Sequence, residues 1–573
     1  MASGFSDDRN YWNRAVGRRG LLRGAAGTGL GVAAASLIGC RGGGSSGGTP
    51  AGTSAPVGAT GGGATATAAP QVSDGFIQLA TRDQPGLDPL EVAATVTERN
   101  SLVYGRLIDT VRGPDENDLF DLKTQPGYSV QGWEVTEGGK KITFKLKQGI
   151  KFHNVAPVSG REQVAEDVKW SIERAMTLPK SQFKAGYADI DKIETPDKYT
   201  VVFNLKRPTR YIMGVLGQEP TFILPKEVDS MQGGFNANAI GSGPFIFEKL
   251  VQGEGSFHKK NPDFVNAKEI YYNRFDVKVV TASEKRQAAV KTGQADDGAI
   301  ALNKTEVKLN EGPTVKSYAT AITGCNFFSF NLNNPKWKDI RVRTAISKSY
   351  DRQAIIDQIL AGDGSFNGPV PVGFGKWALS DQELRQINAN KYDPAEAMKL
   401  WTAAGKPFND MNWYVTPKLN YPEYQAEAEL MSAQMIKNLG IAKHVFATDD
   451  YAVWLPKAYQ GKYDDVTMGP WGDGAEPLNY LMWEYLPGGS RNFSNINDAE
   501  VVKMIDDIVT TLDTPQAIQK ARTVATHIAD KVVASVKPPV ARSYAIYNSK
   551  LQNYRPGLLP YGSDFRFRSW KTK

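Results

Sequence analysis

The sequence predicts an α/β fold with more than one lobe, and three observations predict it. Segments that alternate apolar and polar residues recur along the chain between segments with the spacing of amphipathic helices. Residues 71–573 are numerous enough for two or three domains of ordinary size. Strands and helices are mixed throughout without a clean repeat, which is typical of α/β and α+β proteins.

The first predicted elements are a strand, a loop and a helix. Phe76, Gln78 and Ala80 share one face of a strand, because successive side chains of a strand point to opposite faces. The following "QPGLDP" is rich in turn-forming residues and predicts a loop. The apolar spacing from Thr97 to Leu107 predicts a helix.

A β-hairpin and a helix are predicted next. The Gly-Gly pair at 138–139 is a turn signal, and residues 141–146 after it alternate strictly. Ser159 and Glu162 have the spacing of a capping box, so a helix is expected over 159–176.

Further along, strands are predicted over 197–208 and after Pro244, and helices over 335–360, 421–439 and 499–512. Gly241 and Gly243 precede one of these strands, but no Lys-Ser/Thr pair follows them on a helix. They therefore do not predict a phosphate-binding loop. Asp351 and Arg352 are expected to form a charge pair on a helix surface.

The composition is ordinary for a globular protein, with 41% hydrophobic and 10% aromatic residues. The net charge is +7, and residues 1–39 hold five Arg and two Asp, so their removal would leave +4. Nucleic-acid-binding proteins usually carry a concentrated basic patch, and nothing in this mild charge indicates one. No nucleic-acid partner is expected.

Cysteine and histidine are scarce, which limits redox and metal chemistry. The cysteines are Cys40 and Cys325, and there are four histidines. Cys325 lies in an apolar stretch and is expected to be a small buried side chain rather than a reactive thiol. No histidines pair at metal-ligand spacing, so we expect no metal site built by the protein and no cofactor.

Residues 1–39 have the features of an export signal. Arg18 and Arg19 precede an uncharged run, 24–38, which as a helix would reach only about 22 Å, whereas a bilayer core needs about 30 Å. A basic region before a short apolar core is typical of a signal peptide. The twin arginine resembles a twin-arginine (Tat) signal, and "LIGC" ending at Cys40 resembles a bacterial lipobox, which implies lipidation of Cys40. An amphipathic or buried helix is the alternative.

Residues 40–70 are interpreted as a lipidated cysteine followed by a disordered linker. From 41 onward they are almost all Gly, Ala, Thr, Ser and Pro, which cannot bury apolar surface. A flexible coil of this length has a mean span of roughly 30 Å. The linker would hold a globular body close to a membrane surface.

Five blocks in fixed order connect the body of the chain to a known family. They are "LDP" at 87–89 with "VYGRL" at 103–107, "ITFKLKQGIKFHN" at 142–154 with "AEDVKWSIERA" at 165–175, "IGSGPFIF" at 240–247, "FFSFNLNNPKWKDIRVRTAISKSYDRQAII" at 327–356, and "GPWGDGAEPLNYL" at 469–481. Together they resemble the family 5 extracellular solute-binding proteins of ABC importers, which include dipeptide, oligopeptide and nickel-type members. Ser242 stands where the family usually has threonine.

The resemblance implies a two-lobed clamp of the class II, cluster C periplasmic-binding-protein type, with an extra subdomain on the first lobe. The expected parts are a signal at 1–39, the linker at 40–70, a discontinuous first lobe at 71–115, 196–314 and 531–573, its extra subdomain at 116–195, and the second lobe at 315–530. A solute would bind between the lobes, which close by hinge motion and then dock on a permease. We expect an exported monomer, lipid-anchored at the outer face of the cell membrane or in the periplasm.

The resemblance also implies ligand-contacting residues. Trp471 is the first candidate, and Asp473 is the candidate partner of a ligand ammonium, because an acidic residue follows the tryptophan in peptide-binding members. The "GDGAE" before Pro477 is one residue shorter than expected for a peptide binder, so Glu476 is an alternative anchor. The further candidates are Arg491, Asn492, Tyr104 and Asn331. For these four residues a structural role is the alternative.

A peptide is the expected solute, while a nickel chelate, a sugar, an opine or haem remains open. A ligand sensor that uses the same clamp is a second alternative, since both uses need closure. An enzyme is not expected, because "GSG" at 241–243 lacks the strand-to-helix context of a nucleophile elbow and the four histidines are scattered.

Overall fold

The fold can be followed over most of the chain after residue 71. The computed structural model describes residues 72–81, 86–91, 97–111, 123–179, 181, 184–217, 221–301, 303–319, 324–418, 422–449, 451–471, 476–554 and 569–572. The predicted signal, Cys40 and the predicted linker lie outside these residues. Within the described ranges no helix is both long enough and apolar enough to cross a membrane.

The first strand pairs with a strand far along the chain. β1 (Phe76–Ala80) runs parallel to β12 (Arg274–Val279), and β11 (Gly255–Lys260) and β10 (Phe245–Val251) continue the sheet antiparallel. Phe76 and Gln78 are buried as the alternation predicts, but Leu79 is buried as well. Phe76 and Leu79 belong to different hydrophobic clusters, so both faces of β1 are covered.

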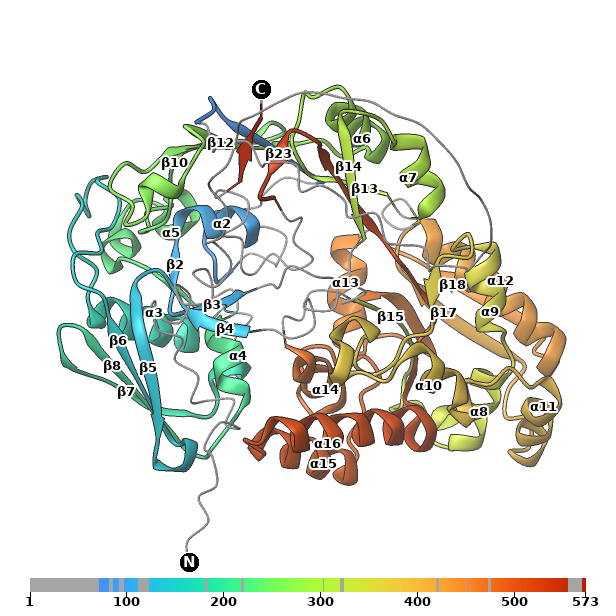
Figure 1. Ribbon diagram of the computed structural model, residues 1–573. Coiled ribbons are helices and arrows are strands. Elements are labelled where there is room, and N and C mark those ends of the chain that lie inside the picture. The colour runs from blue at the N-terminus through green and yellow to red at the C-terminus, as the bar shows by residue number, and fades with distance from the viewer. Residues whose placement is uncertain are drawn as a thin grey trace, which may run out of the picture. The chain divides into compact units, whose positions relative to one another are not determined.

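The hairpin predicted around residues 138–139 is confirmed. β5 (Val130–Thr136) pairs antiparallel with β6 (Lys141–Leu146), and β8 (Thr200–Leu205) and β7 (Ile190–Asp197) extend the sheet. The residues that predict the inner face are buried, namely Ile142, Phe144, Leu146, Val201, Phe203 and Leu205. The helix α3 (Ala165–Thr177) packs on β7 and β8 (Figure 1).

The start of α3 differs from the prediction. Ser159 lies in a turn with a φ of +50°, and the Glu162 carboxylate accepts hydrogen bonds from Lys198 at 2.6 Å and from the hydroxyl of Tyr199 at 3.1 Å. The helix begins at Ala165, where the Asp167 side chain accepts a hydrogen bond from the backbone nitrogen of residue 164 at 2.8 Å. The predicted capping box was wrong because Lys198 and Tyr199, in the turn between β7 and β8, bind Glu162 instead.

The turn at Gly241 and Gly243 fits against the end of α2 (Thr97–Val103). A Cβ atom on Gly241 would lie 2.1 Å from the carbonyl oxygen of Val103, and one on Gly243 would lie 2.5 Å from the carbonyl oxygen of Leu102. His153 holds the turn, because its backbone nitrogen donates to the Gly241 oxygen at 2.7 Å and its Nε2 lies 3.1 Å from the Gly243 oxygen. This glycine-containing block therefore serves packing against the end of α2 and against His153.

Acid is expected to destabilise the fold through two buried histidines, His153 at this turn and His258 in β11. Burial lowers the pKa of His153 from 6.5 to about 4, and it lowers the pKa of His258 to the same value. Both side chains are neutral when folded and bind protons more readily when unfolded. The stability that they contribute is present above pH 6.5 and is lost as the pH falls toward 4.

Urea unfolding at pH 7 and pH 4 measures this effect. We expect the free energy of unfolding to fall by about 3 kcal/mol for each of the two histidines. A His153→Gln variant should show a smaller fall than the unmodified chain. Stability that is the same at both pH values would contradict the prediction.

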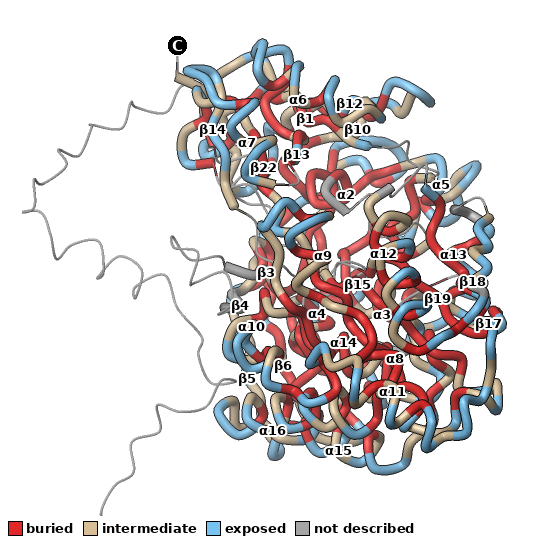
Figure 2. The backbone as a smooth tube through the Cα atoms, turned by 90° about the vertical axis from the view of Figure 1, so that its right-hand side faces the viewer, coloured by how far each residue is buried: buried red, intermediate tan, exposed pale blue. Residues whose placement is uncertain are grey.

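A five-stranded sheet is built from strands between residues 325 and 536. Its order is β18 (Lys443–Ala447), β17 (Asp410–Val415), β19 (Val466–Trp471), β15 (Cys325–Phe330) and β20 (Ser535–Val536). β17 runs parallel to β18 and β19, while β15 runs antiparallel to β19 and β20. Every residue of β15 is buried (Figure 2), so this strand has packed neighbours on both faces.

Helices accompany this sheet along the chain. They are α8 (Ile340–Lys348), α9 (Arg352–Gln358), α10 (Asp381–Gln386), α11 (Pro394–Ala403), α12 (Pro422–Leu439), α13 (Tyr451–Tyr459), α14 (Pro477–Tyr485), α15 (Ala499–Thr510) and α16 (Thr514–His527). Of these, α12 packs on β17 and β19. The helices predicted over 421–439 and 499–512 are confirmed, with small differences at their ends.

The helical block predicted over 335–360 is divided in two by a cap. The Asp351 carboxylate accepts a hydrogen bond from the backbone nitrogen of Gln353 at 2.8 Å and so begins α9. Arg352 is buried and donates to the carbonyl oxygens of Ser347 and Asn390 at 3.1 and 3.0 Å. The predicted surface pair of Asp351 and Arg352 was wrong, because both side chains bind backbone groups instead.

The remaining elements are short. The strands and helices are β2 (Gly105–Arg106), β3 (Ile108–Val111), β4 (Lys123–Pro126), α4 (Tyr211–Gly217), β9 (Phe222–Ile223), α5 (Gly234–Ala237), α6 (Ser283–Lys291), α7 (Lys304–Asn310), β23 (Leu551–Gln552) and β24 (Trp570–Lys571). The helical turns are η4 (Glu137–Gly139), η5 (Lys184–Tyr187), η6 (Lys226–Ser230), η7 (Ala267–Glu269), η8 (Pro335–Trp337), η9 (Val372–Trp377), η10 (Asn388–Asn390) and η11 (Ile528–Val532). α2 ends before Leu107, the predicted end, because β2 pairs with β9.

The chain passes twice between the two groups of sheets. β13 (Ala299–Ala301) and β14 (Val315–Ala319) flank β22 (Tyr544–Asn548) in one small sheet, while β16 (Gly364–Ser365) pairs with β21 (Val540–Ala541). The chain therefore leaves the first group after β14 to enter β15, and it returns from β20 through β21 to β22. Two crossings of this kind are what a hinge between two lobes requires.

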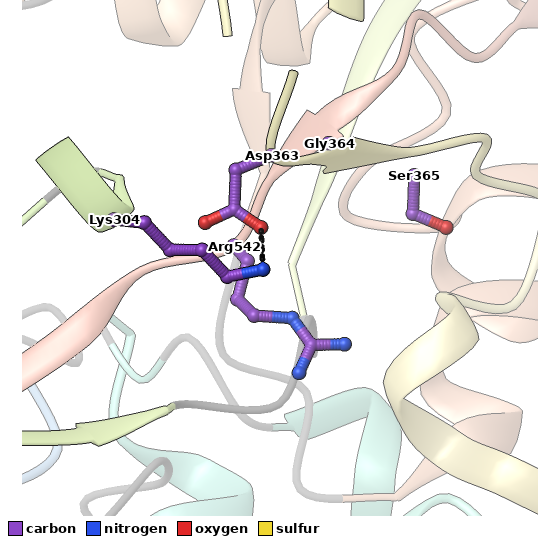
Figure 3. Close-up of a pocket in the computed structure, with 5 residues that line it drawn as sticks. All are labelled: Lys304, Asp363, Gly364, Ser365 and Arg542. Atoms are coloured by element: carbon purple, nitrogen blue, oxygen red, sulfur yellow. Dashed lines mark ion pairs between the residues drawn. The ribbon is translucent and has the colours of Figure 1, made fainter. Parts of the chain in front are cut away.

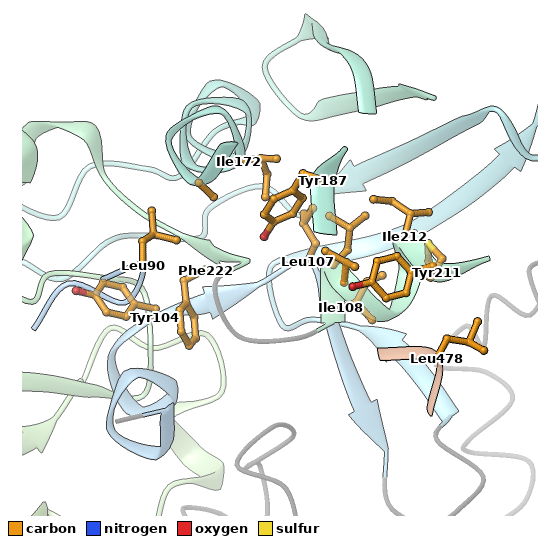
Figure 4. Close-up of a cluster of buried hydrophobic side chains, with 14 of the residues drawn as sticks. Leu90, Tyr104, Leu107, Ile108, Ile172, Tyr187, Tyr211, Ile212, Phe222 and Leu478 are labelled. Atoms are coloured by element: carbon orange, nitrogen blue, oxygen red, sulfur yellow. The ribbon is translucent and has the colours of Figure 1, made fainter. Parts of the chain in front are cut away.

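One hydrophobic cluster includes residues from both groups of sheets. Tyr211 and Ile212 of α4 lie in it with Leu107, and Leu478 of α14 belongs to the same cluster (Figure 4). A second cluster surrounds Trp413 on the five-stranded sheet. Burial of apolar surface in the shared cluster favours the arrangement of lobes in this structure.

Candidate functional site

The predicted ligand wall ends a strand of the five-stranded sheet. Trp471 is the last residue of β19 and pairs with Cys325, the first residue of β15. Its ring lies 4.4 Å from that of Tyr480 and 5.9 Å from that of Phe493, centroid to centroid, and the residue is 2% exposed. Its indole nitrogen has no hydrogen-bond partner among the described residues. A buried donor without an acceptor costs free energy, so the indole nitrogen of Trp471 is suited to donate a hydrogen bond to a ligand.

A buried ion pair lies beside Trp471. Lys537, directly after β20, contacts the two carboxylate oxygens of Glu484 in α14 at 2.6 and 2.7 Å, and their side chains are 3% and 1% exposed. The Lys537 ammonium is 5.8 Å from the centre of the Trp471 ring and 5.9 Å from that of Tyr485. The pair thus connects the second crossing to α14 and to the predicted ligand wall.

Cys325 lies next to this ion pair and has no disulfide partner. It is 2% exposed, and burial raises the pKa of its thiol to about 12. The expectation of a small buried side chain is therefore confirmed, and the raised pKa disfavours the reactive thiolate. Across the described residues, no three His, Cys, Asp or Glu side chains are grouped so that they could hold a metal ion.

The predicted acidic anchor and its alternative follow Trp471. Asp473 lies outside the described residues. Glu476 is described, and its Oε1 accepts a hydrogen bond from the backbone nitrogen of Leu478 at 3.4 Å, which caps α14. Its side chain also contacts α4, since a Cβ atom on Gly214 would lie 3.2 Å from its Cγ. Burial raises the pKa of Glu476 to about 6, although the Arg210 charge opposes the rise.

Arg491 and Asn492 shape the loop after α14. The Asn492 amide nitrogen donates to two carbonyl oxygens of its own loop at 3.1 and 2.9 Å, and its oxygen accepts from a loop nitrogen at 2.9 Å. The Arg491 guanidinium lies 4.1 Å from the centre of the Tyr459 ring. Both residues are close to Trp471 in the fold, because Phe493 beside them packs on its ring.

Asn331 is not brought together with Trp471. It follows β15, whose last residue pairs with Val466 at the start of β19, so roughly 15–20 Å of strand separates it from Trp471. Its amide nitrogen donates to the carbonyl oxygen of Tyr463 at 2.5 Å, and its oxygen accepts from Asn495 at 3.0 Å. These bonds join three loops at the opposite edge of the sheet.

Tyr104 lies in the hydrophobic core. It is 2% exposed, and its ring centroid is 5.4 Å from that of Phe222 (Figure 4). Burial and the nearby carboxylate of Asp88 raise the pKa of the Tyr104 hydroxyl. Asp88 itself is bound to Arg174 of α3 at 2.6 Å. The "LDP" block is thus bound to α3 through the ion pair of Asp88 with Arg174.

Arg210 was missed by sequence reasoning. It is 5% exposed, its Nη1 donates to the carbonyl oxygen of Thr511 at 3.0 Å, and its guanidinium lies 4.7 Å from the centre of the Trp377 ring. Three residues earlier, Arg207 forms an exposed ion pair with Asp506. The segment before α4 is therefore bound to the turn between α15 and α16. Such long-range partners leave no spacing pattern that could have found Arg210.

Two lobes joined by two crossings form the two-lobed fold of the periplasmic binding proteins. The fold resembles that of the ABC transporter-associated periplasmic binding protein DppA from Helicobacter pylori in complex with peptide STSA, with a TM-score of 0.74, 20% identity, and coverage of 88% of this chain and 99% of that one. It also resembles AgaA from A. tumefaciens R10 in complex with agropinic acid, with a TM-score of 0.73, 22% identity, and coverage of 87% and 99%.

The family follows from the sequence match. Residues 123–492 match the bacterial extracellular solute-binding proteins, family 5 Middle, and the chain belongs to this family. It is 27% identical over 488 residues to di/tripeptide-binding protein 1 of Pseudomonas aeruginosa, covering 79% of this chain and 86% of the relative. The protein is thus an ABC-transporter solute-binding protein of a periplasmic or extracellular family and not an enzyme, as the sequence predicts.

Proposed function

We propose that the chain captures a peptide between its two lobes and delivers it to a membrane permease. The observation that carries this proposal is Trp471, whose buried indole nitrogen has no described acceptor and which ends β19 two residues before Asp473. Ligands of open α/β sheets bind at the carboxyl ends of parallel strands, and β17 and β19 are parallel. The similarity to a di/tripeptide-binding protein supports a peptide solute.

In this proposal, the solute's ammonium pairs with Asp473 and its main chain lies against Trp471. A charge-assisted hydrogen bond fixes a peptide's register without reading its side chains. Arg491 and Asn492 hold the neighbouring loop, while Tyr104 and Asn331 support the fold around the cleft.

Asp473→Asn is expected to weaken binding of a dipeptide by roughly 10- to 100-fold, measured by titration calorimetry. A dipeptide with an acetylated amino terminus should bind the unmodified chain just as weakly. Asp464→Asn is the matched control, since Asp464 is exposed at the opposite end of β19 and should leave binding unchanged. Equal binding of the free and the acetylated dipeptide would rule out Asp473 as the anchor.

We infer a discontinuous first lobe that carries an extra subdomain at 116–195, and a second lobe whose bounds lie close to, but not at, the predicted 315–530. The pairing of β14 with β22 supports moving the first crossing to follow Ala319. The pairing of β20 with β15 and of β21 with β16 supports moving the second crossing to just before β22. In this division the contacts of Arg210 join the extra subdomain's flank to the second lobe.

Arg210→Ala is expected to weaken solute binding about tenfold, although in this proposal the Arg210 side chain does not contact the solute. It removes a buried charged donor from the lobe contact, so the closed arrangement is less populated and apparent affinity falls with that population. Calorimetry gives the dissociation constant, and small-angle X-ray scattering should show a larger radius of gyration. Arg207→Ala removes the ion pairs that the partly exposed Arg207 guanidinium makes with Asp506 and Asp189, and it should change affinity less than threefold. Unchanged affinity in Arg210→Ala would remove this contact from the closure mechanism.

The proposal also includes export by a Tat signal with Arg18 and Arg19, and lipidation of Cys40. The linker at 41–70 would keep the lobes near the permease and raise the effective concentration of each for the other. The order of basic region, short apolar run and "LIGC" supports this part.

A second candidate is the same capture of a non-peptide solute such as an opine. The "GDGAE" segment, one residue shorter than expected for a peptide binder, favours it. The structural similarity to a protein in complex with agropinic acid is consistent with it.

A further inference from the structure

A pocket lies where the chain returns from the second lobe to the first. Its volume is about 250 Å³, and it is lined by Lys304 of α7, by Asp363, Gly364 and Ser365 around β16, and by Arg542 after β21 (Figure 3). Its walls therefore come from both proposed lobes and from the second crossing. It is distinct from the site around Trp471, which none of these residues contacts in a described interaction.

The charges around the pocket do not balance. Asp363 supplies the one carboxylate among the lining residues, and its Oδ2 already accepts a hydrogen bond from the hydroxyl of Tyr544 at 2.7 Å. The Lys304 ammonium lies 3.7 Å from the other oxygen, which is too far for a hydrogen bond. Two cations, Lys304 and Arg542, thus face a single carboxylate, one oxygen of which already accepts a hydrogen bond from Tyr544. The lining of the pocket therefore has an excess of positive charge.

Arg542 is placed by its backbone and not by a partner of its side chain. Its backbone nitrogen donates to the carbonyl oxygen of Asp363 at 3.0 Å. Over the residues that the structure describes, its guanidinium has neither an ion pair nor a hydrogen bond, and the residue is exposed. Figure 3 shows its side chain in the same space as the Lys304 ammonium. A guanidinium held in this way has its planar set of donors available to a ligand.

We propose that this pocket binds a small oxyanion, a phosphate or carboxylate group, between Lys304 and Arg542. A guanidinium pairs with both kinds of group through two parallel hydrogen bonds, and an ammonium adds a point charge. The pocket has room for such a group, since one water molecule needs only about 10–15 Å³ of comparable space. Asp363 limits the site to anions that approach from the side of the two cations.

An anion in this pocket would act on the lobes. Lys304 belongs to the first lobe and the β16 segment to the second, so the anion favours the arrangement in which they meet. By linkage it would raise solute affinity by the same factor by which solute raises anion affinity. This coupling rests on the proposed function, whereas anion binding itself does not.

Calorimetric titration of the full chain with inorganic phosphate, and separately with acetate, at constant ionic strength tests the site. We expect saturable binding of one anion, weakened about tenfold or more by Arg542→Gln and by Lys304→Gln. Lys316→Gln, which removes the same charge from exposed β14, should bind as the unmodified chain does. Binding of phosphate alone assigns the site to phosphate groups, and binding of both anions assigns it to oxyanions in general.

Two results would overturn the site: no saturable binding of either anion, or equal binding by Arg542→Gln and the unmodified chain. All three substitutions are at exposed positions, so we expect the variants to fold. Equal melting temperatures without anion would confirm this.

A dipeptide titration with and without phosphate then tests the coupling. We expect tighter dipeptide binding with phosphate, and no such change in Arg542→Gln. Anion binding that leaves dipeptide affinity unchanged overturns the coupling, while failure of any dipeptide to bind contradicts the proposed function and leaves the anion titration valid.

Discussion

Lys537→Met is expected to destabilise the folded protein by about 3–5 kcal/mol, because it leaves the buried carboxylate of Glu484 without its counter-charge. Glu484 is 1% exposed in its side chain, and both of its oxygens depend on Lys537. Urea unfolding of the purified chain at neutral pH measures the loss.

The double variant Lys537→Met/Glu484→Leu separates the charge from the packing. Replacement of a whole buried ion pair by apolar side chains is often neutral or stabilising, so most of the loss should be recovered. The double variant should still differ from the unmodified chain in its affinity for solute, because it loses the Lys537 ammonium that lies over the Trp471 ring. A loss below about 1 kcal/mol in the single variant would show that water reaches Glu484, contrary to the buried pair described here.

Gly241→Ala is expected to cost about 3 kcal/mol or more, at the upper end of what overpacking costs. The new Cβ atom would lie 2.1 Å from the carbonyl oxygen of Val103 and 2.7 Å from Cδ1 of Tyr104. Backbone on both sides must move, and the bonds of the turn to His153 would be strained with it. Thermal and urea unfolding should both show the loss.

Gly312→Ala is the matched control for this substitution. Nothing lies within 4 Å of a Cβ atom at Gly312. The free energy of unfolding should therefore stay the same or rise by up to about 1 kcal/mol, because alanine restricts the unfolded chain. Similar losses of unfolding free energy in the two variants would mean that the stability of the protein does not depend on the close approach of Gly241 to α2.

Local patterns predicted the elements because their causes are local. The alternation over 141–146 defines a buried face by itself, and the sheet of β5 to β8 follows from it. Two predictions were wrong where a side chain has a partner distant in sequence. Glu162 binds residues of the turn between β7 and β8 instead of capping a helix, and Arg352 donates to the carbonyl oxygen of Asn390, 38 residues away.

The candidate site was predictable only in part, for the same reason. Trp471 was found because a block of sequence around it resembles the family, and the strand end places it at the carboxyl edge of a sheet. Lys537 and Glu484 are 53 residues apart, and Arg210 and Thr511 are 301 apart. Neither pair has a spacing that a helix or strand produces, so only the folded chain brings them together.

Direct detection of the solute tests the central claim. The full chain would be screened by thermal shift with di- to hexapeptides, with sugars, with opines, and with nickel in the presence and absence of histidine. A solute at 100 times its dissociation constant should stabilise the fold by about 2.7 kcal/mol, a clear rise in melting temperature. The account predicts that peptides with a free amino terminus produce this rise. A rise with an opine, a sugar or a nickel chelate, and none with any peptide, would contradict it.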